Sequence, residues 1–175
     1  MKKPHEIYVD MDGVLVDFFR GTRNILGYSW DDPRFSTKDK RQERGKILSA
    51  QPNFWANLPP ERDFDQLWSF IKNFHPSILT AYPYDWYDEE RAKSGKWAWC
   101  QKYLHIPHEK FHCVERSSKQ YFAKEHDGSK FGKPNVLIDD MQQNITEWGR
   151  KGGIGILHKN VHDTIHSLKE LGFAT

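Results

Sequence analysis

Two pairs of aspartates, each directly after a short apolar run, are the residues of this chain best suited to chemistry. Asp10 and Asp12 form the first pair, and Asp139 and Asp140 form the second. Four carboxylates within a few ångströms of one another would repel strongly unless a cation lay among them or some were protonated. Ligand sets made only of oxygen favour Mg²⁺, which commonly bridges a protein carboxylate and a substrate phosphate. The pattern therefore favours a bound Mg²⁺, and a phosphate monoester would complete the charge balance.

The same aspartates are suited to transferring a phosphoryl group. An aspartate can attack phosphorus as a nucleophile. A second aspartate two positions further on, as Asp12 is from Asp10, could protonate the leaving oxygen and then deprotonate water. This sequence of events divides a very slow hydrolysis into two easier steps.

Five short apolar runs predict the strands that must position these side chains. Helical patterns lie between most of the runs, and this alternation predicts an α/β fold with a mainly parallel sheet and helices on both faces. The runs are IYVD, SILTA, KFHCVE, NVLIDD and GIGILH. Ligands of parallel sheets bind beyond the carboxyl ends of the strands. Asp10, Thr80 and Asp139 each end a predicted strand, so we expect them to converge on one site.

Helix periodicity is clearest over residues 64–74, 89–104 and 160–172. About sixty residues separate the first two predicted strands, far more than the dozen or so that a crossover needs. We therefore expect a mostly helical insertion over residues 18–75, and a catalytic core formed by residues 1–17 and 76–175. The last helix of the insertion could also belong to the core.

Composition limits the classes of protein and of partner. The 175 residues carry 26 Lys and Arg against 24 Asp and Glu, a formal charge of +2, which argues against a dedicated polyanion-binding protein. The two cysteines lack metal-site spacing, and no run of about 18 apolar residues could span a membrane. We expect a reduced, cytoplasmic protein with no membrane partner and no stable nucleic-acid partner. Whether it forms a homodimer is left open.

Three segments resemble a known family. DMDGVLVD, which begins at Asp10, resembles the first motif of the haloacid dehalogenase (HAD) superfamily of phosphohydrolases. The run that ends at Thr80 resembles the second motif, and VLIDD resembles the fourth. The resemblance implies a Rossmann-like core with a parallel five-stranded sheet in the order 5-4-1-2-3. It also implies a small helical cap after the first strand, dependence on Mg²⁺ and an aspartyl-phosphate intermediate.

Residue roles carried over from this resemblance cover both the chemistry and the metal. Asp10 is the expected nucleophile, and Asp12 is the expected acid and base, which also binds the metal through its backbone carbonyl. Thr80 is expected to donate a hydrogen bond to phosphate. Asp139 is expected to bind the metal together with Asp10, and Asp140 is expected to support the metal site.

The lysine of the third motif is harder to place, because its distance from the other motifs varies. Lys96, Lys119 and Lys124 are the candidates. We favour Lys96, because a narrower resemblance aligns it.

Within the superfamily, the chain is most similar to the 5'(3')-deoxyribonucleotidases, which remove phosphate from nucleoside monophosphates. NFWANLPP resembles the aromatic stretch of that family, GKWAWCQKYL resembles its lysine-aromatic-tryptophan helix, and VERSSK stands where the family has a threonine-arginine-aspartate-lysine segment. The chain departs from the family at two positions. Ala81, at a substrate-binding position, replaces the usual serine, and Met141 replaces arginine.

A high aromatic content of 14% fits a nucleotide substrate, because a base can stack on exposed rings. Phe18, Trp30, Phe54 and Trp55 are the candidate rings of the cap. The leading prediction is thus a Mg²⁺-dependent 5'(3')-deoxyribonucleotidase. The alternatives are a HAD phosphatase for another small phosphate ester or a nucleic-acid end, and a catalytically weak, phosphate-binding regulator.

Overall fold

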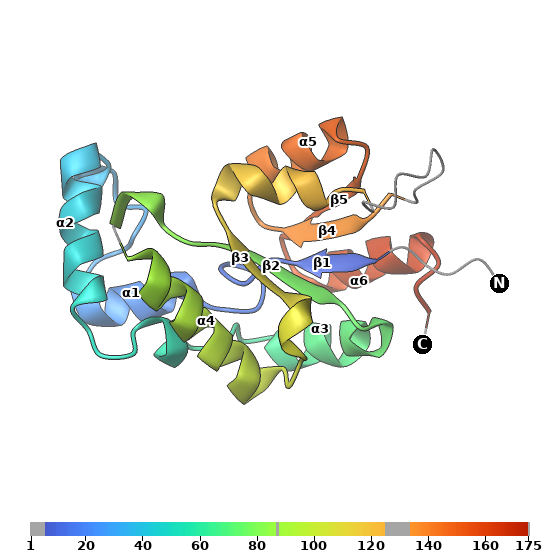
Figure 1. Cartoon of the computed structure of the whole chain (residues 1–175), viewed down its shortest axis with the longest axis horizontal. Helices are drawn as coiled ribbons and strands as arrows, with labels where there is room; N and C mark the ends of the chain where they lie inside the picture. The colour runs from blue at the N-terminus through green and yellow to red at the C-terminus, as the bar shows by residue number, and fades with distance from the viewer. Residues whose placement is uncertain (1–5, 87, 125–133, 175) are drawn as a thin grey trace.

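A single parallel sheet of five strands organises the chain (Figure 1). The computed structural model describes residues 6–86, 88–124 and 134–174. The sheet order is β3-β2-β1-β4-β5, which is the expected order 5-4-1-2-3 read from the opposite edge, so the predicted α/β fold is confirmed. The strands are β1 (Ile7–Val9), β2 (Ser77–Ala81), β3 (Phe111–Val114), β4 (Val136–Asp139) and β5 (Ile154–Leu157).

The helices alternate with the strands, except that several helices separate β1 from β2. The three helices predicted from periodicity are present as α3, α4 and α6. A long 3₁₀ helix over Arg116–Phe122 follows β3. The α-helices are α1 (Phe18–Leu26), α2 (Lys38–Ser49), α3 (Phe64–Ile71), α4 (Glu89–Tyr103), α5 (Gln142–Arg150) and α6 (Val161–Glu170).

The two faces of the sheet bury different side chains, because successive residues of a strand point to opposite sides. Helices α3, α4 and α6 cover the face that carries Ile7 and Val9. The other face, which carries Tyr8, packs against Trp148 of α5 and Phe122 of the 3₁₀ helix. Both faces of the central strands are thus covered, and this burial explains why their sequences read as continuous apolar runs.

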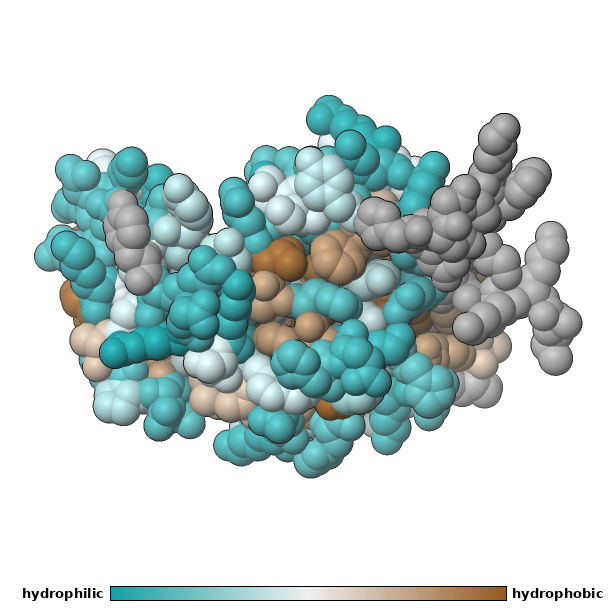
Figure 2. Space-filling view, viewed as in Figure 1, coloured by the Kyte–Doolittle hydropathy of each residue, from teal (hydrophilic) through white to brown (hydrophobic). Residues whose placement is uncertain are grey.

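The segment between β1 and α3, called the cap here, contains α1, α2 and two 3₁₀ helices, Pro33–Phe35 and Trp55–Asn57. Figure 2 shows a notch between this cap, on the left, and the core. The cap packs against the residues that follow β2. Trp86 of this segment lies directly on Gly45 of α2, because a Cβ atom on that glycine would lie only 2.6 Å from the indole ring. Helix α3, at the end of the predicted insertion, packs instead against α6 of the core.

Both cysteines are free thiols. Burial raises the pKa of Cys100 to about 12 and that of Cys113 to about 11, which leaves both thiols protonated and unreactive at neutral pH. No helix in the described part of the chain is both long enough and apolar enough to cross a membrane.

Candidate active site

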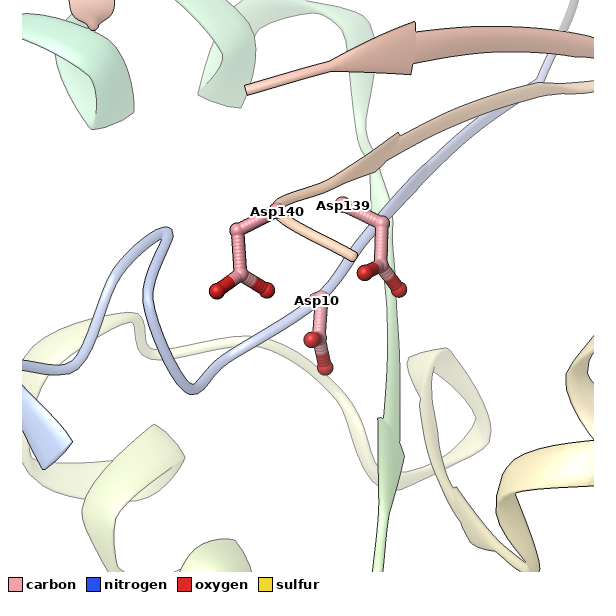
Figure 3. A group of neighbouring side chains, drawn as sticks. All are labelled: Asp10, Asp139 and Asp140. Atoms are coloured by element: carbon pink, nitrogen blue, oxygen red, sulfur yellow. The ribbon is translucent and has the colours of Figure 1, made fainter. Parts of the chain in front are cut away.

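Three carboxylates meet where β1 and β4 end (Figure 3). Asp10, Asp139 and Asp140 each present one oxygen, and these oxygens lie within 4.8 Å of one another. The backbone N–H of Asp10 donates to the carbonyl of Ile138 at 2.9 Å, so the pairing of β1 with β4 continues up to the cluster. The parallel pairing of neighbouring strands therefore brings together two aspartate pairs that lie more than a hundred residues apart in sequence, as expected.

The loop after β1 makes room for this cluster through Gly13. Its φ of 79° lies in the left-handed region, and a Cβ atom there would lie only 2.2 Å from Oδ2 of Asp140. A side chain at this position would therefore be strained and would also displace the carboxylate. Asp17, the third aspartate of this segment, lies outside the cluster: its Oδ1 accepts from the backbone N–H of Arg20 at 2.9 Å and caps α1.

Lys119 lies among the carboxylates. Its ammonium is 2.8 Å from Oδ1 of Asp10 and 2.8 Å from Oδ2 of Asp139. Burial alone lowers the pKa of this lysine, but the two carboxylates outweigh burial and raise the pKa above its usual value. Lys119 therefore stays charged and offsets part of the negative charge at the site.

Lys96 reaches the same site from α4 but contacts different groups. Its ammonium donates to Oδ2 of Asp12 at 2.5 Å, to the hydroxyl of Thr80 at 2.9 Å and to the carbonyl of Ala81 at 2.9 Å. The side chain of Lys96 is almost completely buried. A hydroxyl that accepts one bond keeps its own hydrogen for donation, so Thr80 can still serve as a donor.

The structure thus brings two of the three candidate lysines into the site. Lys119 contacts the expected nucleophile and the expected metal ligand, whereas Lys96 contacts the expected acid and base. Lys124 is exposed and lies against Gly152, in the turn that precedes β5, at the opposite end of the sheet. Loop lengths along the chain could not distinguish Lys96 from Lys119, because the two reach the same strand ends from separate helices.

Burial raises the pKa of three carboxyls at the site, those of Asp12, Asp139 and Asp140. Burial, together with the charges of Asp10 and Asp139, raises the pKa of Asp140 to about 7. Burial also raises the pKa of Asp12, against the opposing effect of Lys96. Asp12 can therefore hold a proton for transfer, and Asp140 would be ionised more readily if a cation lay beside it.

The residues present fit Mg²⁺. Three converging carboxylates supply the hard oxygen ligands that this ion prefers. Gly13 leaves the Asp140 carboxylate unobstructed. Burial, followed by the charges of Asp10 and Asp139, raises the pKa of Asp140, so a cation beside this carboxyl would favour its ionised form. The side chain of Asp12 pairs with Lys96 and is not one of the three clustered carboxylates. A contact between the ion and the backbone carbonyl of Asp12 is what the resemblance to the HAD superfamily implies.

The four cap rings proposed for substrate binding pack largely against one another. Phe18 contacts Trp30, Phe54 and Trp55, with ring centroids 5.3 to 6.5 Å apart, and Trp86 joins the same cluster. Phe54 and Trp55 are buried. The cluster reaches the site through Trp55, whose ring centroid lies 4.9 Å from the Lys96 ammonium.

Several residues of the site escaped the sequence analysis. Trp86 belongs to the aromatic cluster, and its signal in the sequence is the aromatic-rich segment YPYDW that follows β2. Asn144 is buried and donates from Nδ2 to Oδ2 of Asp139 at 2.9 Å. In the sequence it stands out only as the first residue of NIT, a chance match to a glycosylation sequon. Of the two positions that depart from the nucleotidases, Ala81 adjoins Lys96, and Met141 is exposed.

Comparisons with known proteins show the fold. No family model and no curated protein matches the sequence. Among solved structures, the chain is similar to a HAD-superfamily hydrolase from Ehrlichia chaffeensis, with 15% identity over 98% of both chains and a TM-score of 0.51. It is also similar to phosphoserine phosphatase as a phospho-aspartyl intermediate analogue, with 11% identity over 95% of this chain and 99% of that chain and a TM-score of 0.54.

A HAD family enzyme from Bacteroides thetaiotaomicron, solved as a magnesium complex, is a further similar structure. It shares 18% identity over 95% of this chain and 99% of that chain, with a TM-score of 0.50. The protein therefore has the fold of the HAD-superfamily hydrolases, with its aspartate pairs at the carboxyl ends of the central strands.

Proposed function

We propose that the protein is a Mg²⁺-dependent phosphomonoesterase that works through an aspartyl-phosphate intermediate. The observation that carries this proposal is the convergence of Asp10, Asp139 and Asp140 beside two buried lysines. The hydrolases and phosphatase with the same fold support the reaction class. A site with this combination of carboxylates and cations has the groups needed to hold a phosphate dianion and to attack it.

In the first step, a carboxylate oxygen of Asp10 forms a bond to phosphorus while the ester oxygen leaves. Asp12 gives its proton to that oxygen, so the alcohol departs neutral. Lys119 offsets charge at the nucleophile, and Lys96 orients Asp12 and Thr80. The hydroxyl of Thr80 donates a hydrogen bond to a phosphoryl oxygen.

In the second step, water attacks phosphorus and the bond to Asp10 breaks. The ionised Asp12 accepts the proton of the attacking water, which restores both aspartates and releases inorganic phosphate. Asp10, Asp139, Asp140 and the backbone carbonyl of Asp12 are the groups that would hold Mg²⁺. When bound, this ion would neutralise the carboxylates and stabilise the negative charge of the phosphoryl group.

For the substrate, we infer a deoxynucleoside monophosphate. The support is the resemblance of the aromatic and lysine segments to the deoxyribonucleotidases, together with Trp55 beside Lys96. A nucleobase stacked on a cap ring would contribute roughly 1–3 kcal/mol, by analogy with single-stranded nucleic-acid sites.

A generic HAD phosphatase for another small phosphate ester is the second candidate, and two observations favour it. Phe54 and Trp55 are buried in the cap rather than displayed on its surface. Ala81 and Met141 also lack the hydroxyl and guanidinium that the nucleotidases place near phosphate.

The experiment is a screen of phosphate release from 5'- and 3'-nucleoside monophosphates, sugar phosphates and para-nitrophenyl phosphate. Each substrate is assayed with Mg²⁺ and with EDTA, and Asp10→Asn serves as the matched control, since it removes the attacking anion but keeps its shape. Hydrolysis that requires both Mg²⁺ and Asp10, with the highest kcat/KM for deoxynucleotides, is the expected result.

The outcomes separate the candidates. Equal or higher kcat/KM for sugar phosphates would refute the nucleotidase assignment and favour the generic phosphatase. Phosphate binding without turnover would indicate the regulatory alternative, and full activity in EDTA would refute the role of the metal.

A further inference from the structure

A hydrogen-bonded chain leads away from the carboxylate cluster toward the surface. It begins at Asp139, whose Oδ2 accepts from Nδ2 of Asn144 at 2.9 Å. The Oδ1 atom of Asn144 accepts from Nη1 of Arg116 at 3.0 Å. Arg116 also forms a two-pronged ion pair with Glu147, at 2.9 and 3.2 Å. Among the hydrogen bonds of the described residues, none joins Asn144, Arg116 or Glu147 to the proposed nucleophile. The reaction scheme above therefore gives these three side chains no role.

The orientation of the Asn144 amide follows from its partners. An arginine can only donate hydrogen bonds, so the group of the amide that faces it has to be the acceptor. The amide oxygen must therefore face Arg116, and the amide nitrogen must face Asp139. Asn144 is 3% exposed, so water is a poor substitute for either partner. An asparagine is suited to this position because it offers a donor and an acceptor at the same time.

This chain of contacts joins two separate elements that both supply the site. Arg116 begins the 3₁₀ helix that also carries Lys119 one turn later. Asn144 and Glu147 lie on α5, which follows the Asp139–Asp140 pair directly. Binding Arg116 to α5 therefore fixes the 3₁₀ helix, and with it Lys119, relative to Asp139.

The Asp139 carboxylate is held at both of its oxygens. Oδ2 accepts from Lys119 at 2.8 Å as well as from Asn144, and Oδ1 accepts from the backbone N–H of Met141 at 2.9 Å. Groups that hold metal-binding side chains in place commonly change metal affinity or activity by about 10–100-fold when they are mutated.

We propose that Asn144 and Arg116 are positioning residues, which hold Asp139 in the orientation that binds the cation and hold Lys119 against Asp10. This inference rests on the proposed phosphomonoesterase function and extends it to residues outside the reacting groups. Glu147 contributes by keeping the Arg116 guanidinium in place.

The test measures Mg²⁺ affinity by titration calorimetry and, separately, kcat and KM for para-nitrophenyl phosphate. The variants are Asn144→Ala, Arg116→Gln and the double variant. Gln143→Ala is the matched control, because this exposed side chain also binds Glu147, at 3.0 Å, but has no described contact with Asn144 or Asp139. Circular dichroism verifies that each variant is folded.

We expect each single variant to weaken Mg²⁺ binding at least tenfold and to lower kcat more than it raises KM, while the control stays within twofold of wild type. Since the two residues act through one chain of contacts, the double variant should be much less impaired than the product of the single effects. If Asn144→Ala does not fold, Arg116→Gln, which changes a partly exposed residue, decides the question alone.

Less than tenfold weakening of Mg²⁺ binding in every folded variant, in a wild type that binds Mg²⁺ and releases phosphate, overturns the positioning role and leaves the proposed function intact. A wild type that neither binds Mg²⁺ nor releases phosphate refutes the proposed function, and the positioning role with it. The two failures are therefore distinguishable.

Discussion

Removing the charge of Asp140 should stabilise the protein in the absence of metal. Burial of this carboxyl and the nearby charges of Asp10 and Asp139 raise its pKa from an ordinary value of 3.8 to about 7. The folded protein therefore binds this proton more tightly than the unfolded chain does. As the pH rises from about 4 to 7, the unfolded chain ionises first, and the folded state loses stability.

The size of the effect follows from the shift in pKa. Each pKa unit corresponds to about 1.4 kcal/mol, so a shift of about three units corresponds to about 4 kcal/mol above pH 7. Solvent screening of this partly exposed group reduces the expected value to about 2–4 kcal/mol. In a chain of this length, that gain raises the melting temperature by roughly 5–15 °C.

The assay is thermal unfolding of wild type and Asp140→Asn in EDTA at pH 4 and pH 8. The variant should melt higher than wild type at pH 8 and close to wild type at pH 4. Asp65→Asn, which removes one charge from an exposed position of α3, is the control and should change little at either pH. Adding Mg²⁺ at pH 8 should stabilise wild type by about 2.7 kcal/mol at one hundred times its dissociation constant, and should stabilise the variant less.

Two results would refute this reasoning. Equal melting temperatures at pH 8 would show that the Asp140 charge costs nothing in the folded state. Equal stabilisation at both pH values would show that the variant acts through packing rather than through charge.

The remaining predictions concern the nucleophile, a lysine, a glycine and a cap ring. Asp10→Asn should lower phosphate release by orders of magnitude while the circular dichroism spectrum stays unchanged; undiminished release would exclude this nucleophile. Lys119→Met should lower kcat about 100-fold or more, because it removes a cation from the reacting carboxylates; a kcat close to wild type would contradict this role. Gly13→Ala should weaken Mg²⁺ binding, measured by calorimetry, whereas Gly27→Ala, with a similar φ of 78° and open space around it, should not; equal effects would reduce the role of Gly13 to backbone strain. Trp55→Phe should lower kcat/KM for deoxynucleotides by about fivefold or more, relative to para-nitrophenyl phosphate; equal losses would identify this ring as cap packing only.

Local patterns were sufficient to predict most of the fold. The strand runs and the periodicity of residues 64–74, 89–104 and 160–172 reflect burial on one face or on both, and burial leaves a direct trace in residue type. The convergence of Asp10 with Asp139 could also be predicted, because neighbouring parallel strands place their carboxyl ends at the same edge of a sheet.

The sequence predicts a mostly helical insertion after the first strand, but it does not predict how the side chains of this segment pack. The sequence indicated which rings lie in it, but an aromatic side chain has the same signature whether it packs in a core or faces a ligand. The structure shows Phe54 and Trp55 buried and adds Trp86, from the segment after β2, to the same cluster.

By itself, the sequence determined that a parallel α/β sheet would gather aspartates at one edge. Only the tertiary structure decided which cations accompany them. Lys96 and Lys119 lie on helices that approach the site from different directions, and the spacing along a chain does not encode how two helices meet. The role of Asn144 depends in the same way on Arg116, which is 28 residues away in sequence, because a buried hydrogen bond between distant elements forms only once both have packed against the sheet.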